Sequence, residues 1–170
     1  MDYEKIKLMV LDVDGTLTED GIYYDSNGKE IKRFNVKDGL GVLVARNAGL
    51  KFAIITGRVS PMVQRRAEEL EIEYLIQGVQ KKYSALLNLA EKCALSLDEI
   101  GYIGDDLNDL QCMEAVGFCA CPEDAVPQVK KICHHISPMR GGNGAVREIL
   151  EYLLSQRGQW DTVSDVCYRI

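Results

Sequence analysis

The sequence has no apolar run long enough to cross a membrane, since its longest stretches, such as residues 39–45, fall far short of the roughly 20 residues required. Its first residues, MDYEKIK, lack the apolar centre of a secretory signal. Positive charge is not in excess either, because the net charge is −6 at pH 7. That sign argues against nucleic acid or an anionic membrane as a main partner. We therefore expect a cytoplasmic protein without these partners.

Histidine, proline and low-complexity sequence are also scarce. The chain has 2 histidines and 4 prolines in 170 residues, with no repeat and no linker, so we predict one domain over residues 1–170. The 6 cysteines include CAC at 119–121 and another before the two histidines at 133–135, which raises the alternative of a zinc site. Their spacing misses the usual C-x₂₋₄-C pattern, and we expect small core residues instead.

Short β-rich runs alternate with amphipathic helical runs along the chain. Ser60-Pro61 predicts a helix start and Gly49 a helix end. Strands are predicted at residues 7–12, 52–56, 74–77, 101–104, 118–120 and 134–136, and helices at 39–47, 61–71, 81–94, 108–116, 125–132 and 144–156. This order predicts an α/β fold, a Rossmann-like three-layer sandwich with a mostly parallel sheet.

One segment, residues 21–35, departs from this alternation. Two strand-like arms flank Ser26-Asn27-Gly28, and Asn-Gly is a strong hairpin signal. We predict a β-hairpin directly after the first strand and its acidic residues.

Acidic residues and a threonine follow three predicted strands. Asp12 and Asp14 follow the first strand, Thr56 follows the second, and the run GDDLND follows a third. Parallel strands present their carboxyl ends at one edge of the sheet, so these groups should converge there. Such a gathering of carboxylates needs a hard cation, and Mg²⁺ fits a few carboxylates with water and phosphate. Each motif alone has a plain structural explanation, but their joint occurrence at successive strand ends favours a metal site.

Lys82 begins a predicted helix after YLIQG and can reach the same edge. A lysine there would offset the repulsion between a carboxylate nucleophile and a phosphate dianion. Lys81 beside it is interpreted as a solvated bystander.

The ordered motifs D-x-D-G-T, a strand-end Thr, Lys and G-D-D-x-x-D resemble those of the haloacid dehalogenase superfamily of Mg²⁺-dependent phosphatases. The resemblance implies that Asp12 is the nucleophile and Asp14 the general acid and base. It implies that Thr56 and Lys82 bind the phosphoryl group, and that Asp12, the backbone carbonyl of Asp14 and Asp105 hold the metal. Asp106 and Asp109 would support that site from close by.

GIYYDSNGKEIKRFNVKDGLG, AIITGR and RGGNGAVRE extend the likeness over nearly the whole chain. They resemble the capless branch that acts on 3-deoxy-D-manno-octulosonate 8-phosphate, whose relatives act on nonulosonate 9-phosphates. That branch implies a phosphorylated sugar acid as substrate. It also implies a homotetramer in which the hairpin and the C-terminal segment, about residues 158–170, cover a neighbour's site.

A single chain is expected to have difficulty in burying all the apolar residues of that C-terminal segment, which are Trp160, Val163, Val166 and Ile170. The resemblance also places a set of residues at substrate-contact positions, and these are Asn35, Val36, Lys37, Asp38, Gly39, Gly57, Arg58 and Arg66.

Leu43 and Tyr74 depart from the Arg and His usual in the octulosonate branch, which leaves a nonulosonate phosphate as an alternative substrate. A phosphoprotein or another metabolite is a further alternative. A different class of function, a non-catalytic assembly module for a sugar nucleotidyltransferase, would be favoured by missing acids or a missing lysine, and all are present.

Overall fold

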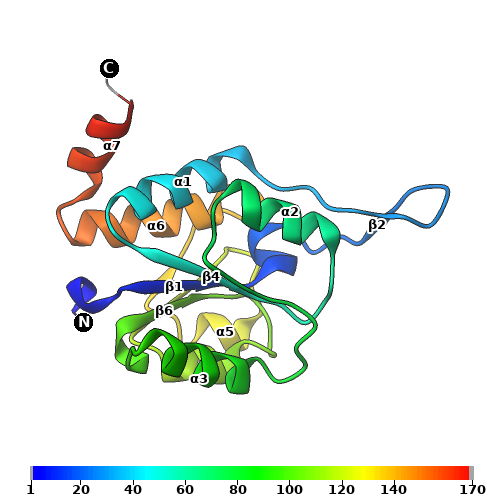
Figure 1. The fold of residues 1–170 in the computed structure, drawn as a ribbon, viewed down its shortest axis with the longest axis horizontal. Coiled ribbons are helices and arrows are strands. Elements are labelled where there is room, and N and C mark those ends of the chain that lie inside the picture. Colours follow the sequence, from blue (N-terminus) through cyan, green and yellow to red (C-terminus); the bar gives the residue numbers. More distant parts are fainter. Residues whose placement is uncertain (1, 169–170) are drawn as a thin grey trace.

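The computed structural model describes residues 2–168 and centres on a parallel sheet of six strands in the order β5-β4-β1-β6-β7-β8 (Figure 1). The strands are β1 (Leu8–Leu11), β4 (Lys51–Ile55), β5 (Tyr74–Ile76), β6 (Ile100–Ile103), β7 (Phe118–Cys121) and β8 (His135–Ile136). β1 lies between β4 and β6 and is fully buried, as its unbroken apolar run LMVL predicts. The six predicted strands are confirmed, each to within one residue at its ends.

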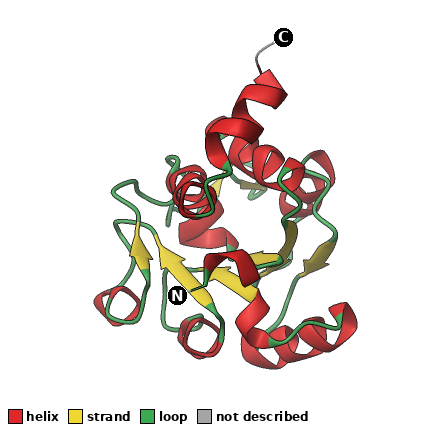
Figure 2. Cartoon of the chain, turned by 90° about the vertical axis from the view of Figure 1, so that its left-hand side faces the viewer, coloured by secondary structure: helices red, strands yellow, loops and turns green. Residues whose placement is uncertain are grey.

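Helices cover both faces of the sheet and form two apolar cores (Figures 1 and 2). On one face lie α1 (Val36–Asn47), α2 (Pro61–Glu69) and α6 (Ala145–Gln156), and on the other α3 (Lys82–Cys93), α4 (Leu110–Ala115) and α5 (Pro127–Lys130). Successive β1 residues alternate between them, since Met9 packs with the first group and Val10 with the second. The predicted three-layer α/β fold is confirmed.

The predicted hairpin is present and projects from the body of the molecule (Figure 1). Its antiparallel strands are β2 (Tyr23–Tyr24) and β3 (Glu30–Ile31). In the turn, the Asp25 carbonyl accepts from Gly28 N–H at 3.0 Å, and Gly28 has a positive φ of 75°.

The C-terminal helix α7 (Trp160–Tyr168) was not among the predicted helices (Figure 2). Its apolar side chains are buried only in part, as expected for a single chain. Trp160 and Val163 pack against the core within the same chain, and the Arg147 guanidinium lies 4.7 Å from the centre of the Trp160 ring. Val166 is 79% exposed. Ile170 lies outside the described residues.

The cysteines whose side chains are described are free thiols, and those of β7 are buried, as expected of small core residues. The side chain of Cys167 lies outside the description. Among residues 2–168, the structure contains no helix that is both long and apolar enough to span a bilayer.

Candidate active site

The loop after β1 is the first part of the site. Asp12 N–H donates to the Ile103 carbonyl at 2.9 Å, which continues the sheet ladder into the loop. The chain then makes one wide turn over Val13–Leu17, closed by a hydrogen bond from Thr18 N–H to the Val13 carbonyl at 2.9 Å, with Gly15 at φ 90°. A Cβ on Gly15 would lie 2.1 Å from a carboxylate oxygen of Asp105 and 2.5 Å from one of Asp20. The glycine of D-x-D-G-T therefore allows the acidic side chains to approach the loop.

Lys82, the first residue of α3, is the central cation of the site. Lys82 is only 3% exposed, and its Nζ lies 2.7 Å from Asp12 Oδ1 and 2.8 Å from Asp109 Oδ1. Tyr102 of β6 donates to the same Asp109 oxygen at 2.8 Å. The other Asp109 oxygen accepts from Asp105 N–H at 3.2 Å. Asp109 is thus committed to protein donors on both oxygens.

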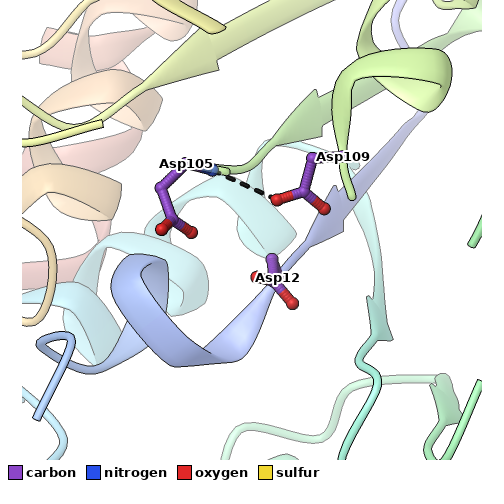
Figure 3. A group of neighbouring side chains, drawn as sticks. All are labelled: Asp12, Asp105 and Asp109. Carbon is purple, nitrogen blue, oxygen red and sulfur yellow. Dashed lines mark hydrogen bonds between the residues drawn. The ribbon is translucent and has the colours of Figure 1, made fainter. Parts of the chain in front are cut away.

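Three carboxylates, those of Asp12, Asp105 and Asp109, offer oxygens that all lie within 4.8 Å of one another (Figure 3). They come from the loops after β1 and β6, which are neighbouring strands. Asp105 Oδ1 accepts from Thr16 Oγ1 at 3.0 Å, so the threonine of D-x-D-G-T orients it. Because Asp109 is held by protein donors, Asp12 and Asp105 are the side chains with capacity for a cation.

The charges in this cluster shift its titration. Burial and the Asp109 charge raise the pKa of Asp12 to about 7, against the lowering effect of Lys82. Burial and the charges of Asp12 and Asp109 raise the pKa of Asp105 to about 8. Burial lowers the pKa of Lys82, but the two neighbouring carboxylates outweigh it and raise the pKa overall. The raised pKa values show that the ionised acids are not fully compensated by Lys82, and a hard divalent ion bound to their oxygens would supply the missing positive charge.

A cavity of about 440 Å³ opens over these residues. Eight of the predicted site residues line it, and they are Asp12, Asp14, Thr56, Gly57, Arg58, Lys82, Asp105 and Asp106. Asp109 lies beneath them, fully buried. The predicted convergence of the strand ends is thereby observed.

The other predicted substrate contacts do not line this cavity within one chain. Asn35 caps α1, accepting from Lys37 N–H at 2.8 Å, and Val36 is 83% exposed beside it. Arg66 of α2 donates to the Asn35 carbonyl at 3.2 Å and packs against Gly39.

Asp38 is turned into the fold. It is 1% exposed, and its Oδ1 accepts from Arg147 N–H at 2.8 Å at the start of α6. Its side chain links α1 to α6. Asp38 was predicted to contact substrate, but in this structure it is buried between the two helices.

Several groups at the site were not predicted from the sequence. The hairpin residue Lys32 pairs with Asp14, and Glu30 pairs with Arg58. Asp20 and Asp124 also line the cavity. The proximity of Asp20 to D-x-D-G-T was a usable signal, whereas the hairpin pairs depend on how the chain folds back.

The segment RGGNG, residues 140–144, packs against the loop of Val13–Leu17. A Cβ on Gly141 would lie 1.9 Å from the Gly15 carbonyl oxygen. Gly142 N–H donates to the Thr16 carbonyl at 3.0 Å. This close packing against the loop explains why glycines stand at positions 141 and 142.

Comparison with known proteins decides the family. A family model described as haloacid dehalogenase-like hydrolase matches residues 75–149. The chain is 41% identical over 158 residues to the 3-deoxy-D-manno-octulosonate 8-phosphate phosphatase of Escherichia coli K12, covering 93% of this chain and 84% of the relative. The chain belongs to the haloacid dehalogenase-like hydrolases.

Solved structures of this hydrolase family agree with the fold. The crystal structure of 3-deoxy-D-manno-octulosonate 8-phosphate phosphatase from Moraxella catarrhalis, with magnesium, phosphate and KDO, has a TM-score of 0.92 at 42% identity, covering 96% of each chain. The cobalt-bound deoxy-D-mannose-octulosonate 8-phosphate phosphatase of Haemophilus influenzae has a TM-score of 0.89 at 36% identity, covering 94% of each chain.

Proposed function

We propose that the chain is a Mg²⁺-dependent phosphatase that hydrolyses the phosphomonoester of a keto-deoxy sugar acid, 3-deoxy-D-manno-octulosonate 8-phosphate or a close relative. One observation carries the proposal: the Asp12 carboxylate lines the cavity, 2.7 Å from Lys82 Nζ and beside Asp105. The names of relatives that match almost the whole chain support the substrate class.

In this proposal the side chains of Asp12 and Asp105 and the backbone carbonyl of Asp14 would hold the metal. Asp106 and Asp109 support them. When bound, Mg²⁺ supplies positive charge that offsets the repulsion between the carboxylates and a phosphate dianion. Asp109 contributes indirectly, because it orients Lys82 and the backbone at Asp105.

The chain's own residues account for the steps of the reaction. The Asp12 carboxylate attacks phosphorus, and the phosphorus–oxygen bond to the leaving alcohol breaks while Asp14 gives that oxygen a proton. Asp14 then takes a proton from the water that attacks the aspartyl-phosphate, which releases phosphate and restores Asp12. Thr56 and Lys82 hold the phosphoryl oxygens in both steps.

Arg58 and Gly57 follow Thr56 and line the cavity, and in this proposal they contact the sugar acid. An arginine suits the substrate carboxylate because its guanidinium can pair with both oxygens.

The remaining predicted substrate contacts do not line the cavity of their own chain, and they are Asn35, Val36, Lys37, Asp38, Gly39 and Arg66. The residues of this set that are exposed could contact substrate only if it were bound in the site of a neighbouring subunit. This requirement fits our proposal that the single-domain chains form a cytoplasmic homotetramer. Exposed apolar side chains on the hairpin and α1 support that assembly, and they are Ile22, Tyr23, Tyr24, Ile31, Val36, Leu40 and Leu43. Light scattering should give the mass of four chains.

The test is phosphate release from 3-deoxy-D-manno-octulosonate 8-phosphate and from nonulosonate 9-phosphates, with Mg²⁺ and after chelation. We expect metal-dependent release from the octulosonate ester. A clear preference for the nonulosonate ester would move the substrate to the related branch. Activity on neither ester would refute the substrate assignment.

A further inference from the structure

The second strand of the hairpin returns to the cavity and places a lysine against Asp14. The Lys32 ammonium forms an ion pair with Asp14 Oδ1, and its side chain is only 6% exposed. The hairpin that carries it otherwise extends into solvent, where Tyr23, Tyr24 and Ile31 are exposed. A buried lysine on an exposed hairpin indicates a specific role for its contact.

Glu30, two residues earlier, fixes the lysine from its other side. Glu30 Oε1 lies 3.5 Å from Lys32 Nζ and also pairs with Arg58 Nη2. Glu30 therefore links the hairpin to the segment after β4. The resulting chain of alternating charges, Arg58–Glu30–Lys32–Asp14, begins and ends at residues that line the cavity.

This arrangement limits the positions of the Asp14 carboxyl. The side chain of Asp14 is 33% exposed, and its hydrogen bond from Lys32 engages Oδ1. Oδ2 is then the oxygen left to exchange a proton with a leaving group or a water. Proton transfer needs heavy atoms about 2.6 to 3.2 Å apart, so a freely rotating carboxyl would spend little time in the productive position.

We propose that Lys32 is a positioning residue for proton transfer: it holds the Asp14 carboxyl in the orientation that serves the leaving oxygen, and Glu30 holds Lys32. This inference rests on the proposed phosphatase function and extends it to two hairpin residues outside the four motifs.

The dependence of the rate on the leaving group tests this role. An alkyl alcohol leaves poorly without a proton, whereas p-nitrophenol leaves readily without one. For Lys32→Met we expect kcat/KM on 3-deoxy-D-manno-octulosonate 8-phosphate to fall by about 10². We expect kcat/KM on p-nitrophenyl phosphate, which reports the first chemical step, to change by less than about threefold. Glu30→Gln should also lower kcat/KM on 3-deoxy-D-manno-octulosonate 8-phosphate, by a smaller factor than Lys32→Met. It should leave kcat/KM on p-nitrophenyl phosphate nearly unchanged.

Two further variants separate positioning from general damage. Lys29→Met removes an exposed lysine from the same hairpin and should leave both substrates unaffected. In an Asp14→Asn background, Lys32→Met should cause no further loss on the alkyl ester, because the group that it positions is gone. An equal loss on both substrates, or an undiminished loss in that background, would overturn the inference. If the unaltered chain hydrolyses no phosphate ester, the proposed function fails instead.

Discussion

Lys82 brings a positive charge into the interior and is flanked by two carboxylates that would otherwise be buried without a counter-ion. The motif alone led us to expect a lysine that reaches a phosphate. The structure adds a second role, because Asp12 and Asp109 depend on the same ammonium.

Replacement of Lys82 by alanine should therefore reduce stability as well as activity. Removing one partner from a buried ion pair costs about 3 to 5 kcal/mol. We expect a loss of this size in the free energy of unfolding for Lys82→Ala, measured by urea denaturation. Lys81→Ala, at the exposed neighbouring lysine, should change it by less than about 0.5 kcal/mol. Similar losses of unfolding free energy in the two variants would contradict the buried ion pairs of Lys82 with Asp12 and Asp109.

Individual residues differ in how far the sequence predicts them. Asp12, Thr56, Lys82 and Asp105 lie together because they follow strands of one parallel sheet, and strand ends can be inferred from apolar runs. The hydrogen bond from Tyr102 to Asp109 could not be inferred, because Tyr102 reads as a core residue of its strand.

At the scale of elements, strands were predicted more closely than helices because their apolar runs end sharply. Helix α1 begins at Val36, three residues before its predicted start. Val36 is exposed, so the apolar periodicity does not include the first turn. The N-cap of Asn35 was the signal that could have placed it. Helix α7 was missed because the C-terminal segment was interpreted only as a partner surface.

The packing of RGGNG on the loop of Val13–Leu17 predicts that Gly141→Ala impairs activity. An added Cβ would collide with the Gly15 carbonyl oxygen and shift the loop that carries Asp14. We expect kcat to fall by at least about tenfold in a phosphatase assay, since small displacements of catalytic groups cost that much or more.

Gly28→Ala, in the hairpin turn, is the matched control. Its Cβ would meet no atom within 4 Å, although its positive φ makes alanine locally strained. We expect near-normal kcat for this variant. Comparable losses in both variants would show that the collision is not the cause.

At the scale of the whole molecule, the acid cluster makes stability depend on pH and metal. The pKa of Asp12 is raised to about 7 and that of Asp105 to about 8, above their ordinary value of 3.8. Between pH 4 and pH 8 these two groups bind more protons in the folded chain than in the unfolded chain. Their contribution to the free energy of unfolding therefore falls as the pH rises through this range.

In chelator, the melting temperature should therefore be lower at pH 8 than at pH 5.5. Each pKa unit corresponds to about 1.4 kcal/mol, or roughly 3 to 6 °C for a chain of this size. Mg²⁺ should raise the melting temperature more at pH 8 than at pH 5.5, because a larger fraction of these carboxylates is ionised there. Asp105→Asn should weaken both effects. A Mg²⁺ effect that is equal at the two pH values would contradict a site formed by these acids.

The most direct test of the central claim is to look for the phosphoryl group on Asp12. The chain is mixed with substrate and Mg²⁺, quenched in acid within one turnover, and analysed by peptide mass spectrometry. We predict one added phosphoryl group on the peptide that contains Asp12, and its absence in an inactive Asp12→Asn variant. Full turnover by Asp12→Asn, or a phosphoryl group found on a different residue, would contradict the assignment of Asp12 as nucleophile.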